Sequence, residues 1–166
     1  MNFQIRDNSL TGIDLKGASM VDMAPCTIRQ MEPAELDQCA ALFERVGQAH
    51  FHWQPRHLYT RTVFLECARE EHVWVADVSG SIAGLLTYYE PEHFIHFLMI
   101  DAPMRGQGIA RALLAATRNH YGRRHDLKVN MRNQDARAFY DRLGYIVTGA
   151  GHDIDTGDWF RLSSPG

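Results

Sequence analysis

The chain has 166 residues, of which 45% are hydrophobic and 22% charged, and its formal net charge is −3 with histidine neutral. This length suits one domain with a proper core, and the composition excludes a chain that is disordered throughout. The small negative net charge gives no electrostatic case for a nucleic-acid partner, and no apolar run approaches the length of a membrane-spanning helix.

The first 24 residues differ from the rest of the chain, because they mix polar and small residues without sustained periodicity. Their start carries Arg6, Asp7 and Asp14 and lacks the apolar core of a signal peptide. We therefore predict an N-terminal extension at residues 1–24 and one domain at residues 25–166. The sequence leaves open whether the extension is flexible, a mis-assigned start, derived from cloning, or an arm that packs on a partner.

The three cysteines, Cys26, Cys39 and Cys67, are odd in number, lack metal-type spacing and sit among apolar neighbours. This pattern favours buried, reduced thiols and hence a cytoplasmic protein.

The first half of the domain begins with an alternating stretch at Cys26–Gln30, which predicts a strand. Pro33 then opens a helix that we expect to end at about Gly47, and a second helix is predicted at about Leu58–Arg69. Between the two helices lies His50–His57, a segment dense in aromatic and imidazole groups.

The second half alternates strands and helices. A hairpin of two strands is predicted around Ser79-Gly80-Ser81, and Gly144 is expected to stop the last helix. The predicted elements are strands at 72–78, 82–89, 94–100, 127–131, 145–148 and 159–162 and helices at 109–120 and 133–143, with an acidic loop between the last two strands. Hairpins followed by a strand-helix-strand crossover imply a mixed sheet covered by helices.

The loop Arg105–Ala110 joins a hydrophobic strand to an amphipathic helix and contains two glycines. Small residues let backbone N–H groups approach an anion, and the start of the helix adds its positive dipole end, so phosphate is the natural ligand. The dinucleotide fingerprint does not fit, because Arg111 stands where its third glycine would be, and the Gly-Lys-Ser/Thr ending of the P-loop is absent.

The pattern that fits the loop is R-x-x-G-x-A, formed by Arg105, Gly108 and Ala110. Here the chain resembles the GNAT superfamily of N-acetyltransferases, whose coenzyme-A motif is Q/R-x-x-G-x-G/A. A second segment, N-x-x-A-x-x-F-Y-x-x-x-G-Y at residues 133–145, resembles another motif of that family. The resemblance spans about residues 25–163 and implies an α/β (α+β) fold with a mixed, mostly antiparallel twisted sheet of about six or seven strands and about four helices.

The resemblance implies acetyl-CoA as cosubstrate, no metal, and direct attack of a primary amine on the thioester. The pantetheine arm of CoA would pair with the end of the central strand and bond to Asn133, and the pyrophosphate would lie on the glycine loop. Tyr140 would be the general acid and also contact CoA, since a phenol stays protonated at neutral pH. The implied CoA contacts are Leu98, Met99, Ile100, Arg105, Gly106, Gln107, Gly108, Ile109, Ala110, Asn133 and Tyr140.

The general base is the point at which the resemblance fails. Ribosomal-type relatives carry a glutamate twelve residues before the tyrosine, and here that residue is Lys128. Two-residue alternation would put Phe94, His96, Leu98 and Ile100 on one strand face, with His96 toward the cleft. An imidazole is a competent base near neutral pH, so His96 is our catalytic candidate. A buried structural role for His96 stays open, as do Glu90 and Glu92 acting through water.

The acceptor region is less defined. In the family the segment between the first two helices commonly shapes the acceptor pocket, which suggests Phe51, Trp53 and Tyr59 as wall residues, with Glu90 as a further candidate. His50, His52 and His57 lack the spacing of a metal site. The acidic loop after residue 152 would attract a cationic amine if it overhangs the cleft.

We therefore predict an acyltransferase that acetylates an amine acceptor, either a small molecule or a protein amine. The alternative is an acyl-CoA-binding sensor or interaction module that has lost turnover, which the lysine at position 128 favours. An RNA-binding role for the arginine-rich loop is a third reading, against which the net charge argues. Dimers are common in the resembled family, so a homodimer stays open.

Overall fold

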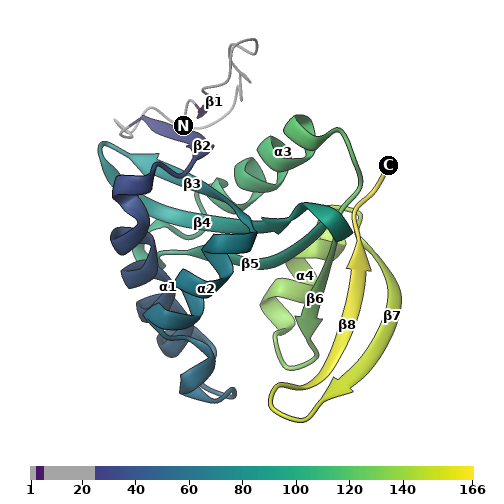
Figure 1. The fold of residues 1–166 in the computed structure, drawn as a ribbon. Helices are drawn as coiled ribbons and strands as arrows, with labels where there is room; N and C mark the ends of the chain where they lie inside the picture. Colours follow the sequence, from purple (N-terminus) through teal and green to yellow (C-terminus); the bar gives the residue numbers. More distant parts are fainter. Residues whose placement is uncertain (1–2, 6–24) are drawn as a thin grey trace.

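The computed structural model describes residues 3–5 and 25–166. Its strands form one sheet in the order β1-β2-β3-β4-β5-β6-β8-β7, drawn in Figure 1. The strands are β1 (Phe3–Ile5), β2 (Cys26–Gln30), β3 (His72–Val78), β4 (Ser81–Tyr89), β5 (Phe94–Ile100), β6 (Asp126–Asn130), β7 (Ile146–Asp153) and β8 (Gly157–Ser163). The α-helices are α1 (Leu36–His50), α2 (Arg61–Glu70), α3 (Ile109–Tyr121) and α4 (Gln134–Arg142).

The sheet is mixed, because only β1/β2 and β5/β6 pair in parallel and every other neighbouring pair is antiparallel. The expected mostly antiparallel sheet flanked by four helices is confirmed. Strand β1 lies inside the predicted extension of residues 1–24 and adds a short edge strand beside β2. The other predictions for that segment fall outside the described residues.

Helices cover both faces of the sheet. On one face α1 and α2 pack with Val75, Leu85 and Met99 in a first core. On the other face α3 and the α4 tyrosine Tyr140 pack with Ile28 and other strand residues in a second core. Their apolar stripes are buried against the sheet, which accounts for the helical periodicity of the sequence.

The sheet divides between β5 and β6. These strands pair only at Phe94 with Asp126 and at Ile95 with Leu127. Beyond Ile95, β5 keeps its pairing with β4 on one side, while β6 pairs along its length with β8. Figure 1 shows that β6, β7 and β8 run in a clearly different direction from β2 to β5. The last residues of β5 therefore have one edge that β6 does not cover.

A β-bulge at His96 changes the face on which the residues of β5 lie. Thr87 of β4 pairs with Phe97 and Tyr88 pairs with Ile95, so His96 is the extra residue. As a result Ile95 joins Leu98 in the core of α3 and α4, and the predicted common face of residues 94, 96, 98 and 100 is wrong. Simple alternation fails here because one inserted residue reverses the order of the faces.

Two further expectations are corrected. Helix α1 does not end at Gly47 but continues to His50. Gly47 serves close packing instead, because a Cβ there would lie 2.5 Å from ring atoms of Tyr59. The acidic loop is shorter than predicted, since β7 reaches Asp153 and β8 starts at Gly157. By contrast, Gly144 follows the end of α4 with a φ of 79°, as expected for a helix stop.

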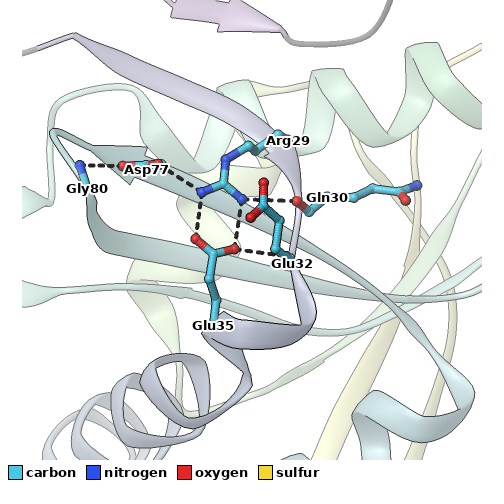
Figure 2. Close-up of polar contacts among 6 residues, drawn as sticks. All are labelled: Arg29, Gln30, Glu32, Glu35, Asp77 and Gly80. Atoms are coloured by element: carbon cyan, nitrogen blue, oxygen red, sulfur yellow. Dashed lines mark hydrogen bonds and ion pairs between the residues drawn. The ribbon is translucent and has the colours of Figure 1, made fainter.

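An ion-pair cluster ties the start of the domain together, as Figure 2 shows. The Arg29 guanidinium of β2 donates to both carboxylate oxygens of Glu35, at 2.7 and 2.6 Å, and to Asp77 of β3 at 2.8 Å. Glu35 also accepts from the backbone N–H of Glu32. This bidentate arrangement fixes the turn into α1 against the sheet.

Candidate active site

Two cavities meet at the division of the sheet. The first, of about 300 Å³, lies between β5 and β6 and extends to the β7–β8 hairpin. The second, of about 630 Å³, lies along the end of β5, the loop after it and the starts of α3 and α4. The residues that line both are Leu98, Asn133, Ala136 and Tyr140. The two cavities are therefore adjacent and share Tyr140 in their walls.

The glycine loop, Arg105–Ala110, forms part of the wall of the second cavity. Gly106 and Gly108 have φ values of 75° and 81°, a backbone conformation that favours glycine, and Gly108 is the N-cap of α3. The first N–H groups of a helix have no intrahelical partner, and the helix dipole is positive at this end. Together with the Arg105 and Arg111 side chains that line the cavity, this surface suits a phosphate.

Arg105 is held in place by two contacts. Its Nε donates to the carbonyl oxygen of Ile100 at 3.2 Å, and its Nη1 lies 3.2 Å from Nδ1 of His50 at the end of α1. Burial and the charge of Arg105 lower the pKa of His50, so its imidazole is the neutral acceptor of this bond. The guanidinium is thus fixed at the mouth of the cavity.

Leu98, Met99 and Ile100 line the second cavity beside the uncovered edge of β5. Each pairs with β4 on its other side. An unpaired strand edge offers backbone N–H and C=O groups to an extended ligand. The amide-containing pantetheine arm of CoA has this shape and chemistry, so the chain's own residues fit the predicted cosubstrate.

Asn133, which precedes α4, and Tyr140, which lies within it, line both cavities. The Asn133 side chain is the N-cap of this helix and accepts from the N–H of Ala136 at 3.1 Å, which leaves its Nδ2 group to donate to a ligand. Tyr140 is 7% exposed. Burial raises its pKa, and neighbouring Tyr145 adds to the effect, so the phenol keeps its proton at neutral pH.

The first cavity has a largely aromatic wall. Its aromatic lining consists of Phe51, Tyr59, Phe94, Phe97, Tyr140 and Trp159. The Nζ group of Lys128 lies 3.9 Å from the centre of the Trp159 ring and 3.6 Å from the Asp153 carboxylate. The Lys128 and Asp153 charges therefore offset each other at this wall, so the pair adds no net negative charge to the cavity.

His96 lines the same cavity, and its Nδ1 lies 2.7 Å from Oε1 of Glu71. The side chain of His96 is 43% exposed, so it is not a buried structural histidine. The Glu71 carboxylate, by contrast, is only 8% exposed.

Three predicted contacts lie elsewhere. Trp53 and Glu90 line neither cavity: Trp53 packs against His50, Phe51 and His52, and Glu90 bonds His72 at 3.0 Å. The side chain of Gln107 turns back to the carbonyl of Pro103, so only its backbone remains for an anion. Trp53 and Gln107 find partners within their own segments and Glu90 finds one at the start of β3, which residue type alone does not reveal.

Sequence reasoning also missed residues of the first cavity. Gln54, Asn130, Thr156 and Trp159 line it, and Glu71 supports it through His96. They come from four separated segments that carry no shared motif. An aromatic residue in the last strand was the only signal in the sequence, and it equally describes a core position.

The comparison with known families decides the class of this fold. A model described as "Acetyltransferase (GNAT) domain" matches residues 39–156, which is most of the chain. The chain belongs to the GNAT family of acetyltransferases. Members of this family are N-acetyltransferases that use acetyl-CoA and act on amine acceptors, so the predicted family and enzyme class are confirmed.

One relative of this GNAT chain with a curated activity is a 5-NmdU N-acetyltransferase of Pseudomonas phage PaMx11. It is 38% identical over 84 residues, which is 46% of this chain and 59% of that protein. The match thus spans less than two thirds of the relative's length.

Solved structures share the fold. YjaB of Escherichia coli, in its apo form, has a TM-score of 0.71 at 22% identity and covers 85% of this chain and 98% of its own. The ribosomal-protein-S18-alanine N-acetyltransferase of Escherichia coli has a TM-score of 0.69 at 18% identity. The match covers 84% of this chain and 93% of that one. Naa50 of Arabidopsis thaliana, in complex with the bisubstrate analogue CoA-Ac-MVNAL, has a TM-score of 0.65 at 20% identity. The match covers 85% of this chain and 99% of that one.

Within residues 3–5 and 25–166, no group of three His, Cys, Asp or Glu side chains is placed to hold a metal ion. In the same part of the chain, no helix has the length and apolar character to cross a bilayer. The cytoplasmic location and the homodimer stay predictions.

Proposed function

We propose that this GNAT chain transfers the acetyl group of acetyl-CoA to a primary amine by direct attack of the amine on the thioester. The observation that carries the proposal is the meeting of two cavities at Tyr140, one lined by the glycine loop and the other by aromatic side chains. A reaction between two bound substrates needs this arrangement, because the reacting atoms must be held within contact distance.

The second cavity would bind acetyl-CoA. The loop from Arg105 to Ala110 would take the pyrophosphate through backbone N–H groups, and the edge of β5 at Leu98–Ile100 would pair with the pantetheine arm. Asn133 would donate to the same arm. Acetyl-CoA would supply the activated thioester, and the chain's residues would orient it.

Two side chains would move protons. Tyr140 keeps its proton because burial raises its pKa, so it would donate to the sulfur as the C–S bond breaks. His96 would accept a proton from the acceptor ammonium, because it faces the first cavity and its Nδ1 is already taken by Glu71. Lys128 is engaged by Trp159 and Asp153 and would take no part as base.

The lining of the first cavity favours an acceptor with a flat, apolar or aromatic body. Aromatic rings pack well against such groups. A cavity of about 300 Å³ is at the lower end of those that hold small molecules. The names of the relatives give two acceptors for direct comparison: 5-NmdU, and the alanine of ribosomal protein S18.

The test is release of free CoA thiol from acetyl-CoA near pH 8 with a panel of amines. The panel contains arylalkylamines, polyamines, 5-NmdU and a peptide that begins with alanine. Wild type should turn over at least one class, and Tyr140→Phe should lose about 10²- to 10³-fold in kcat, because only the proton donor is removed. Tyr145→Phe is the matched control, since this buried tyrosine touches Tyr140 but lines neither cavity.

A second candidate function is acyl-CoA sensing without turnover, which the lysine at position 128 favours. It predicts that acetyl-CoA binds while no amine in the panel releases thiol. Turnover that survives unchanged in Tyr140→Phe would contradict the role of this residue but not the enzyme class.

A further inference from the structure

The environment of Glu71 is unusual for a carboxylate. Glu71 follows α2 directly as its C-cap residue, and its backbone N–H is bonded to the carbonyl of Cys67. Its side chain points inward and is only 8% exposed, while neighbouring Glu70 is exposed. Burying an ionised carboxylate costs roughly several kcal/mol unless a hydrogen-bonding or charged partner compensates it.

The compensating partner is His96. Oε1 of Glu71 lies 2.7 Å from Nδ1 of His96, and Oε2 is buried without a hydrogen bond of normal geometry among the described residues. Burial acts to raise the pKa of Glu71, but His96, the Thr87 hydroxyl and the Cys67 thiol outweigh it and hold that pKa below its ordinary value. The carboxylate is therefore ionised at neutral pH.

The β-bulge is what allows this contact. His96 is the residue of β5 without a partner on β4, so the direction of its side chain does not follow the regular alternation of the strand. The bulge is fixed by a hydrogen bond from the N–H of Phe97 to Oγ1 of Thr87, at 3.2 Å. With Nδ1 directed to Glu71, the remaining ring nitrogen, Nε2, is the atom that can accept a proton in the cavity.

We propose that Glu71 is a positioning residue for catalysis: it holds His96 in the Nδ1–H tautomer and stabilises the imidazolium that forms when His96 takes a proton from the acceptor. The inference rests on the proposed function. Glu71 does not touch the substrates, since it lines neither cavity, and acts only through His96. A carboxylate that orients an imidazole in this way recurs in unrelated enzymes.

The proton balance is complete. The acceptor ammonium gives one proton to Nε2 of His96, and this proton leaves to solvent. The free amine forms the N–C bond as the C–S bond breaks, and the sulfur takes the Tyr140 proton. The second N–H proton of the attacking amine replaces it on Tyr140. Ammonium and acetyl-CoA thus give amide, CoA thiol and one released proton, while Glu71 stays ionised throughout.

The kinetic test compares Glu71→Gln, His96→Gln and the double variant, with the most active amine of the panel. Glu71→Gln should lower kcat by about 10²-fold, while the KM for acetyl-CoA stays unchanged. The double variant should be no slower than His96→Gln alone, because Glu71 acts only through this histidine. Glu70→Gln is the matched control, since it removes the same charge from the exposed neighbouring position and should leave kcat within about twofold.

A second readout needs no acceptor. In protein labelled with ¹⁵N-histidine at pH 8, the ring shifts should report His96 as the Nδ1–H tautomer in the wild type, and this tautomer should lose its dominance in Glu71→Gln. A carboxylate that only supports the fold would leave the tautomer and the kcat of a folded variant unchanged.

The outcomes separate the two proposals. If His96→Gln abolishes turnover but Glu71→Gln is as active as wild type, the role of Glu71 is overturned and the proposed function stands. Additive losses in the double variant would also overturn it. If wild type releases no CoA with any amine, the proposed function fails first and the positioning role fails with it.

Discussion

His125 shows how strongly burial acts on a single titratable group in this fold. It is 2% exposed, and its Nε2 lies 2.5 Å from the hydroxyl of Tyr145. Burial, with the nearby Arg118 charge, lowers the pKa of His125 to about 4, although Asp126 opposes the shift. The neutral form of His125 therefore predominates in the folded protein above that pH.

This produces a pH dependence of stability. In the unfolded chain an ordinary histidine takes up a proton below about pH 6.5, whereas folded His125 does so only near pH 4. The unfolded state thus binds more protons, and stability falls as the pH falls from 6.5 to 4, by about 3 kcal/mol at roughly 1.4 kcal/mol per pH unit. His125→Gln should reduce this slope in urea unfolding, whereas Tyr145→Phe, which keeps the histidine, should retain it.

At the scale of elements, α3 has a glycine of positive φ near each end. Gly106 precedes its start with a φ of 75°, and Gly122 is its C-cap with a φ of 61°. A Cβ at either position would meet no heavy atom within 4 Å. The two sites therefore impose the same kind of backbone strain on alanine, but only Gly106 lines the cavity proposed for CoA.

This pair separates binding from stability. Gly106→Ala and Gly122→Ala should each cost about 1 kcal/mol of unfolding free energy, because alanine disfavours positive φ. Only Gly106→Ala should weaken acetyl-CoA binding, by about tenfold, since its methyl group stands where phosphate would approach the backbone. Calorimetric titration alongside thermal unfolding measures both. Equal affinity losses in the two variants would remove the loop from the CoA site.

For the whole molecule, the cluster around Arg29 joins β2, β3 and the entry to α1 (Figure 2). The Arg29, Glu35 and Asp77 side chains are 15–21% exposed, so solvent screens them only partly. The hydrogen bonds from Arg29 lower the pKa of Glu35, against the opposite effect of burial. This contribution is present above the ordinary pKa of a glutamate and is lost as the pH falls through the lowered value.

Arg29→Met should therefore destabilise the domain by roughly 2 kcal/mol. This lies between the ~0–1 kcal/mol that an exposed ion pair contributes and the ~3–5 kcal/mol lost when a fully buried pair is broken. The loss should be largest near neutral pH and shrink in acid as Glu35 is protonated. Arg61→Met is the control, because its pair with Asp37 is exposed and should contribute less than about 0.5 kcal/mol. Chemical unfolding at pH 7 and pH 4 tests both expectations.

The elements of the fold were predictable because the apolar pattern and the turn residues that specify each one lie within or beside its own segment. Strands at Cys26–Gln30, His72–Val78 and Phe94–Ile100 were predicted with the bounds that the structure has. Errors fell where a distant side chain overrides local preference. Gly47 has the pattern of a helix end, yet Tyr59 packs against it within a continuing helix.

The site divides in the same way. A loop of glycines before a helix has its chemistry in the backbone, so the sequence alone determined the family, the sheet with its helices and the candidate phosphate loop. The His96–Glu71 pair and the aromatic cavity depend on a one-residue bulge and on strands that separate after two pairs, which carry no local signal. Only the tertiary structure decided them, because side chains 25 positions apart meet through packing rather than through spacing.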